Sequence, residues 1–190
     1  MSSKEKHLAV IADEINKCRE CFLCDSPGKH VPGEGNADAN VVFVGEAAGA
    51  TEAELGRPFV GRAGKLLDNM IASIGLSRND VFISNICHCR PPNNRKPKPD
   101  EITACLPYLI RQLDIIKPKV IVALGSTALG GLTGQDGGVI SRCGNLEEID
   151  IYDRRIKLIP QFHPAGILRN PNWKKPAWYA MQKVAKELAI

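Results

Sequence analysis

Four short apolar runs rich in β-branched residues, separated by helical patterns, set the narrowest limits on how this chain folds. The runs cover residues 41–47, 81–85, 120–126 and 156–162. Helical periodicity covers residues 4–17, 62–75 and 99–117, and a closing helix is expected at about 176–189. Strands that alternate with helices predict a three-layer α/β/α fold with a central four-stranded parallel sheet. A chain of 190 residues favours one domain, residues 1–190, with the N-terminal segment 1–35 packed on it.

The carboxyl ends of these strands are where a ligand is expected. In open parallel sheets, ligands bind in the crevice beyond those ends. The segments to inspect therefore follow residues 46, 85, 125 and 162. They include a carboxylate at Glu46, an amide at Asn85 and an imidazole at His163.

Charge is distributed unevenly, although the net charge is only +4. Basic side chains are concentrated in residues 90–119 and in residues 165–190, where five of them accompany Glu187 alone. Such clusters suit a phosphate backbone, and a solvated charged face is the alternative interpretation. No apolar run approaches the roughly 20 residues that a membrane helix needs, so we expect a cytoplasmic protein without a membrane partner.

Seven cysteines are more than a cytoplasmic chain needs for packing, and a reducing compartment disfavours disulfides. Cys18 and Cys21 form a C-x2-C pair, and residues 87–105 add a C-x-C pair and a further cysteine. Four thiolates suit either tetrahedral zinc or an iron–sulfur cluster, and the spacing does not separate these two. A metal or cluster site is therefore predicted.

The turn after the first strand, GEAAGATEAELGRPFVGRAG, is rich in glycine but is not a phosphate loop. It lacks the G-x-x-x-x-G-K-[ST] pattern, and its acidic residues would repel a phosphate. Glu46 suits general-base work or stabilisation of a developing positive charge, or it complements the dipole of the next helix. Phe59 either packs on the core or stacks on a flat base.

Seven features in a fixed order extend over nearly the whole chain. They are C-x2-C at 18–21, VPGEG at 31–35, GEAAG at 45–49, GRPFVGRAG at 56–64, SNICHCRPPNNRKP at 84–97, Cys105, and HPAGILRNP at 163–171. Together they resemble the family 4 uracil-DNA glycosylases, thermophile-type members of their superfamily that carry a [4Fe-4S] cluster. The resemblance implies an enzyme that flips uracil out of DNA and hydrolyses the N-glycosidic bond, leaving an abasic site for base excision repair.

Site residues follow from the same resemblance. It implies that the cluster is held by Cys18, Cys21, Cys89 and Cys105. It makes Glu46 and His163 catalytic, and it places four residues around the base, namely Ala47, Glu52, Phe59 and Asn85. Asn85 offers both a donor and an acceptor, which complements the edge of uracil better than that of cytosine. Ala48 stands where the family usually has proline.

The resemblance also implies a DNA-binding surface. Its expected members are Arg90, Asn94, Arg95, Lys96, Ile167, Leu168 and Arg169. Ile167 and Leu168 are expected to fill the gap that the flipped base leaves, and Arg169 to hold a phosphate. The expected partners are uracil-containing DNA, single- or double-stranded, and a sliding clamp as a candidate; a monomer is expected.

Other interpretations remain open at this point. A superfamily member that traps itself on the abasic sugar needs a histidine in the loop at residues 90–99, which has none. A family 5 relative would have a non-acidic residue in place of Glu46. The chain could also be a non-catalytic nucleic-acid-binding module stabilised by zinc or iron–sulfur, or an electron carrier, although an electron carrier leaves Phe59 and Asn85 unexplained.

Overall fold

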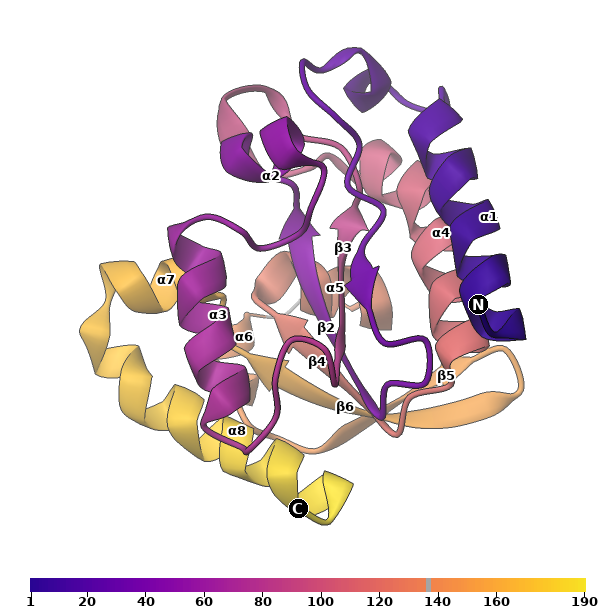
Figure 1. Ribbon diagram of the computed structural model, residues 1–190. Helices are drawn as coiled ribbons and strands as arrows, with labels where there is room; N and C mark the ends of the chain where they lie inside the picture. Colours follow the sequence, from indigo (N-terminus) through magenta and orange to yellow (C-terminus); the bar gives the residue numbers. More distant parts are fainter. Residues whose placement is uncertain (136–137) are drawn as a thin grey trace.

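A six-stranded mixed sheet runs through the centre of the computed structural model, which describes residues 1–135 and 138–190 (Figure 1). Its strand order is β1-β3-β2-β4-β6-β5. The strands are β1 (Glu34–Gly35), β2 (Val41–Ala47), β3 (Phe82–Cys87), β4 (Val120–Leu124), β5 (Glu147–Ile151) and β6 (Arg154–Gln161). The four strands β3, β2, β4 and β6 are parallel, which confirms the predicted core of the sheet.

The two edge strands are the difference from the prediction, because β1 and β5 pair antiparallel with their neighbours. β1 has only two residues and no apolar run, so its sequence gave no strand signal. β5 alternates buried and exposed positions and forms a hairpin with β6 through a turn at Tyr152, whose φ is 51°. Short or charged edge strands reduce edge-to-edge aggregation.

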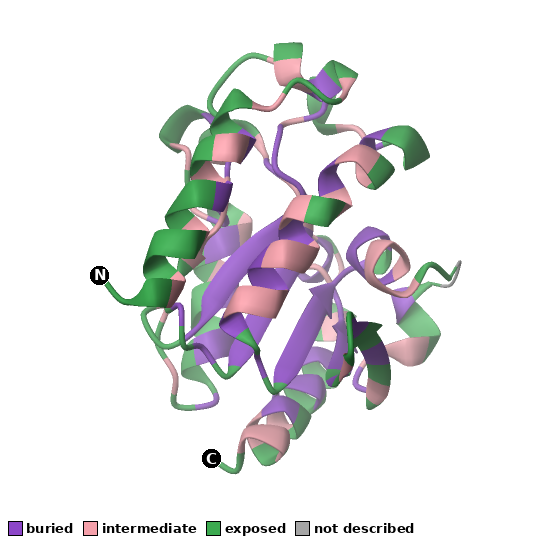
Figure 2. Cartoon of the chain, turned by 90° about the vertical axis from the view of Figure 1, so that its right-hand side faces the viewer, coloured by how far each residue is buried: buried purple, intermediate pink, exposed green. Residues whose placement is uncertain are grey.

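Helices cover both faces of the sheet, as the three-layer prediction requires (Figures 1 and 2). One layer is built from α1 (Ser3–Lys17), α4 (Pro99–Ile116) and α5 (Ser126–Thr133). The other contains α3 (Arg62–Ala72), α6 (Val139–Arg142), α7 (Pro164–Arg169) and α8 (Lys174–Leu188). Figure 2 shows that the strands are almost wholly buried, whereas the helices keep an exposed face. Four predicted helices are thus present within a few residues of their expected ends.

The short elements lie mainly at the end of the sheet where the parallel strands finish. They are α2 (Ala50–Leu55) and three 3₁₀ turns, η1 (Phe22–Asp25), η2 (Pro92–Asn94) and η3 (Pro171–Trp173). α2 follows β2, η2 follows β3, and η3 continues from α7. Among the described residues, no helix is both long and apolar enough to span a membrane.

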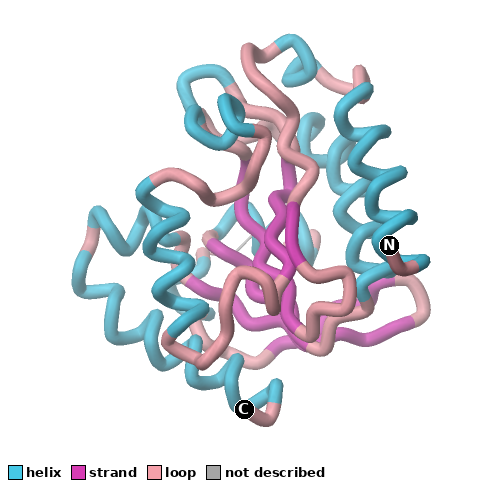
Figure 3. Tube along the Cα trace, viewed as in Figure 1, coloured by secondary structure: helices cyan, strands magenta, loops and turns pink. Residues whose placement is uncertain are grey.

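The segment between α1 and β1 runs over the end of the sheet with little regular structure (Figure 3). It is attached through its backbone, because Lys29 N–H donates to Ala53 O at 2.6 Å and Val31 N–H donates to His88 O at 2.7 Å. The His30 ring also donates from Nδ1 to Ile15 O at 2.5 Å. These contacts bring Cys18, Cys21 and Cys24 beside the region that follows β3.

Candidate functional site

A cavity of about 630 Å³ lies at the carboxyl ends of the parallel strands, where a ligand was predicted. All six predicted catalytic and base-contacting residues line it: Glu46, Ala47, Glu52, Phe59, Asn85 and His163. Four of the predicted DNA-contacting residues line it too, namely Asn94, Arg95, Lys96 and Arg169. The carboxyl ends of β2, β3 and β4 and the segments that follow β2, β3 and β6 therefore meet at one site.

Asn85 is the most informative residue in this cavity. It lies in β3 directly opposite Gly45 of β2, and its side chain is only 1% exposed. Its Oδ1 atom has no hydrogen-bond partner in the part of the chain that the structure describes. A buried polar atom without a partner costs about 1–3 kcal/mol, so its retention points to a ligand that supplies the missing donor.

Gly45 makes room for this arrangement. A Cβ atom at position 45 would lie 2.6 Å from the Phe59 ring and would also collide with Asn85 Oδ1. Glycine therefore allows the Phe59 ring and the Asn85 amide to approach the same stretch of β2 backbone.

Phe59 lies in a loop whose backbone is strained. Its φ is 50°, a left-handed conformation that bulky residues rarely adopt and that costs on the order of 1–3 kcal/mol. Gly64 permits this loop to close, since a Cβ there would overlap the Phe59 carbonyl. The Phe59 ring is buried, and its centroid lies 5.6 Å from that of His163. A flat aromatic face thus borders the cavity beside the imidazole.

Glu52 holds the same loop from the cavity side. Its Oε1 atom accepts hydrogen bonds from Val60 N–H at 3.0 Å and from Gly61 N–H at 2.9 Å. The carboxylate is therefore engaged with backbone next to Phe59 as well as lining the cavity. This positioning contact was not anticipated from the sequence.

His163 is fixed in one protonation state by its surroundings. It caps the N-terminus of α7, and its Nδ1 accepts a hydrogen bond from Ala165 N–H at 3.1 Å. Burial, with a smaller contribution from Arg169, lowers the pKa of His163 to about 4. The ring is therefore neutral near pH 7, and its proton must reside on Nε2 because Nδ1 is an acceptor. This leaves an Nε2–H donor for a ligand in the cavity.

The predicted ligand thiols lie in one neighbourhood on the other side of β3. Burial, followed by the nearby thiols of Cys105, Cys21 and Cys18, raises the pKa of Cys89 to about 12. Cys105 Sγ accepts from His88 N–H at 3.3 Å. Among the residues that the structure describes, no three His, Cys, Asp or Glu side chains converge closely enough for one metal ion. The four predicted ligand thiols nevertheless lie close enough to influence one another's pKa.

Cys24, Cys87 and Cys143 lie outside the predicted ligand set, and the last two have different surroundings from each other. Cys87 Sγ donates to Glu101 O at 3.8 Å, and its interaction with the Cys105 thiol raises the pKa of Cys87 and lowers that of Cys105. Cys87 therefore contacts a predicted ligand rather than standing apart from the thiol group. Cys143 packs with the opposite helical layer, and its Sγ lies 3.6 Å from Gln161 Oε1.

The predicted DNA-contacting residues lie near the mouth of the cavity, with one correction. Leu168 is 42% exposed, but Ile167 is 2% exposed and belongs to the core beside α3 and α8. The expectation that Ile167 fills the DNA stack is therefore wrong, because α7 turns this side chain inward. Of these two neighbours, Leu168 is the one whose side chain is exposed.

The basic loop after β3 is partly tied to the protein itself. Arg95 makes a bidentate ion pair with the buried carboxylate of Glu101, at 2.8 and 2.6 Å. Arg90 Nε donates to Asn94 Oδ1 at 2.8 Å. Lys96 is exposed at the rim of the cavity. The loop is thus held in a fixed shape, with Lys96 as an exposed cation at the cavity.

Comparison with known proteins identifies the group to which this geometry belongs. A model of the Uracil DNA glycosylase superfamily matches residues 32–185. The chain belongs to this superfamily. The superfamily match includes every cavity-lining residue described above, and its first residue falls within the VPGEG motif.

Curated relatives place this superfamily member more narrowly. It is 47% identical to a type-4 uracil-DNA glycosylase of Archaeoglobus fulgidus, over 87% of this chain and 85% of the relative. It is 44% identical to type-4 enzymes of Saccharolobus solfataricus, over 96% and 87%, and of Thermotoga maritima, over 90% and 88%. These similarities confirm the family 4 assignment made from the motifs.

One group of residues at this superfamily site was missed by reasoning from the sequence. Arg78 donates to the carbonyl oxygens of Pro58 and Phe59 and pairs with Glu34. Glu34 belongs to the VPGEG motif, which carried no assigned role beyond the resemblance. No local sequence pattern links residue 78 to residue 59. The carbonyl groups of a glycine-rich, irregular loop need hydrogen-bond donors from outside the loop, and this need is the one sequence signal that points to such a contact.

Proposed function

We propose that this protein excises uracil from DNA, releasing the free base and leaving an abasic site, as the first step of base excision repair. The observation that carries this proposal is the buried amide of Asn85, whose Oδ1 has no partner in the described structure although it faces a cavity. Uracil supplies the N3–H donor for Oδ1 and the O4 acceptor for the Asn85 amide nitrogen. The type-4 names of the relatives support the same activity.

Recognition requires that the base leave the helix. The bond between the sugar and the base cannot be reached in stacked DNA, so the nucleotide is flipped into the cavity at a cost of a few kcal/mol. Phe59 provides the aromatic face on which uracil stacks, beside the Asn85 amide that reads its edge. Leu168 fills the gap that remains in the DNA, and Arg169 at the cavity mouth binds an adjacent phosphate.

His163 and Glu46 carry the chemical step. As the N-glycosidic bond breaks, negative charge develops on uracil O2 and positive charge on the sugar. The neutral His163 ring donates its Nε2–H toward O2, a contribution that resembles an oxyanion-hole donor. Glu46 is the carboxylate at the end of β2 available to stabilise the sugar cation or to orient the attacking water.

A [4Fe-4S] cluster is the metal group that the thiols suit best. Cys18 and Cys21 from the N-terminal segment would hold it together with Cys89 and Cys105. Cys87 and the His88 backbone N–H would then contact the Cys105 ligand from outside the cluster. When bound, the cluster joins the segment after α1 to the loop after β3 and supplies no redox step to the hydrolysis.

The remaining expectations complete the proposal. The DNA-binding surface is formed by Arg90, Asn94, Arg95, Lys96, Leu168 and Arg169, and it accepts uracil in single- or double-stranded DNA. The protein acts in the cytoplasm as one domain and as a monomer, with a sliding clamp as a candidate partner.

The test is an oligonucleotide assay. Oligonucleotides with U:G, U:A and T:G pairs are incubated with the wild type and with Glu46→Gln, and abasic sites are then cleaved by alkali. The proposal predicts strand breaks at uracil only, and a strongly reduced rate for Glu46→Gln. DNA binding without strand breaks would favour the alternative, a non-catalytic binding module with the same fold. The visible absorbance of an iron–sulfur chromophore, measured on the same sample, separates iron–sulfur from zinc.

A further inference from the structure

Arg78 is tied to the backbone of the loop that carries Phe59. It lies between α3 and β3, where its side chain is 20% exposed. Its Nη1 donates to Phe59 O at 3.0 Å, and its Nη2 donates to Pro58 O. Two successive carbonyl groups of an irregular loop thus share one guanidinium, whose fork of donors suits such a task better than an ammonium group does.

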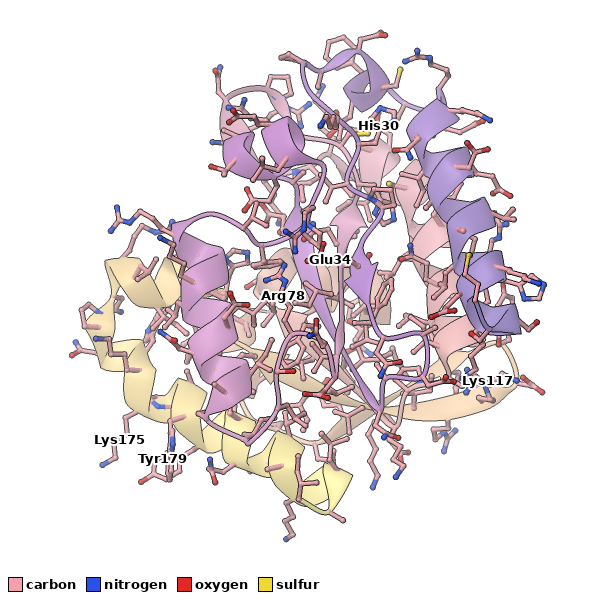
Figure 4. All side chains as sticks on the ribbon, in the orientation of Figure 1. His30, Glu34, Arg78, Lys117, Lys175 and Tyr179 are labelled. Atoms are coloured by element: carbon pink, nitrogen blue, oxygen red, sulfur yellow. The ribbon has the colours of Figure 1, made fainter. Side chains whose placement is uncertain are left out.

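Two carboxylates fix this guanidinium from behind. Arg78 Nε donates to Glu34 Oε1 at 2.8 Å, and Nη1 donates to Asp68 Oδ1 at 2.8 Å. Burial alone would raise the pKa of Glu34, but hydrogen bonds from Arg57 and Arg78 hold it below its usual value. Figure 4 shows Glu34 and Arg78 side by side, Glu34 on β1 and Arg78 on the segment between α3 and β3. The pair is therefore charged and fixed rather than a loose surface contact.

The Phe59 loop needs such support. Phe59 has a φ of 50°, which a phenylalanine does not adopt without external restraint. Glu52 binds the N–H groups of Val60 and Gly61, and Arg78 binds the carbonyl groups of Pro58 and Phe59. Donors and acceptors on both sides of Phe59 are thus satisfied by two oppositely charged side chains, which together determine where the ring points.

We propose that Arg78, held by Glu34, is a positioning residue that sets the Phe59 ring for stacking on the flipped base. The inference rests on the proposed function and gives the carboxylate of VPGEG a role in it. Arg78 lies behind the Phe59 backbone and does not line the cavity. Arg78 acts through Phe59, so removal of the Arg78 side chain should slow the reaction by no more than removal of the Phe59 ring does.

The test measures single-turnover uracil release by Arg78→Ala, Phe59→Ala and the double variant. Misplacement of a positioned group by about 1 Å costs on the order of 10²-fold, so Arg78→Ala should slow release by about that factor. The double variant should be no slower than Phe59→Ala, because both changes remove the same contact. Free guanidinium should partly restore Arg78→Ala but not Phe59→Ala. A drop that adds fully to that of Phe59→Ala would overturn the inference.

Two further variants separate positioning from folding. Arg142 has a side-chain exposure similar to that of Arg78, 19%, and forms an ion pair with Glu147 outside the cavity lining. The Arg142→Ala variant should therefore release uracil at the wild-type rate. If Arg78→Ala does not fold, Arg78→Lys retains the charge beside Glu34 but cannot fork to both carbonyls, so release should still slow. Wild-type rates for Arg78→Lys and Arg78→Ala would refute the positioning role. An inactive wild type would instead count against the proposed function itself.

Discussion

The cavity wall and the thiol-bearing segment lie side by side but are stabilised in different ways. The cavity wall, residues 45–64 and 82–87, is built on two adjacent parallel strands and on a loop held by Glu52 and Arg78. The thiol-bearing segment, residues 18–30, has one 3₁₀ turn and few backbone anchors. Packing and hydrogen bonds thus form the wall, whereas the segment is anchored through its cysteines in the proposed ligand assignment. Changes in the wall should alter the reaction, and changes in the segment should alter stability.

The largest effect is expected in the thiol-bearing group. Cys89→Ala should abolish bound iron and lower the free energy of unfolding by about 4 kcal/mol, because loss of a metal group is among the most destabilising changes. Iron content, visible absorbance and thermal unfolding measure this. Cys143→Ala is the matched control, since Cys143 lies in the other helical layer and should keep the iron. A brown, fully stable Cys89→Ala protein would refute the ligand assignment.

A smaller effect, on rate rather than on stability, is expected in the wall. Gly45→Ala places a methyl group against Asn85 and Phe59, so it should slow uracil release by on the order of 10²-fold while iron content stays constant. Gly130→Ala is the control, because among the described residues its Cβ would meet only Gln135 O, at 3.4 Å, and a helical alanine is favourable. Equal rates for the two variants would show that the wall is less tightly packed than described.

Much of this wall was predictable, whereas its support was not. Parallel strands bring their carboxyl ends together, so Glu46, Asn85 and His163 could be assigned to one site from the pattern of apolar runs. The edge strands were missed because β1 is two residues long and β5, EEIDI, has only two apolar residues. The Arg78 contact was missed because it joins a side chain to distant backbone carbonyls, and such contacts leave no sequence periodicity.

The α7 segment shows how a motif can be right while one of its residues is misassigned. HPAGILR was predicted as a DNA-contacting loop, yet it forms a short helix in which successive side chains point in different directions. Ile167 therefore enters the core and Leu168 faces outward. Hydrophobicity alone cannot distinguish these two neighbours.

These neighbours provide the next prediction. Leu168→Ala should reduce uracil release from duplex DNA by about tenfold, with little change on single strands, because only the duplex leaves a gap to fill. Ile167→Ala should instead destabilise the fold by about 2–5 kcal/mol through a core cavity. Paired duplex and single-strand assays with thermal unfolding measure both. The reverse pattern would restore Ile167 as the wedge.

The smallest effect concerns pH. The folded pKa of His163 is about 4, below the ordinary value near 6.5, so the folded protein binds fewer protons than the unfolded chain between these values. Its contribution to stability is therefore present above about pH 6.5 and is lost as the pH falls toward about 4. NMR titration of the histidine rings, with His163→Asn for assignment, should give a midpoint near 4. A midpoint near 6.5 would contradict the lowering of the His163 pKa by burial.

The most direct test of the central claim is uracil release by Asn85→Ala. The account holds that a buried, unpaired amide selects uracil, so Asn85→Ala should release uracil from a U:G oligonucleotide on the order of 10²-fold more slowly or worse. Asn69→Ala, on the exposed face of α3, should match the wild type. Retained iron would show that the thiol-bearing segment is intact. Release by Asn85→Ala at the wild-type rate, or no release by the wild type, would contradict the account.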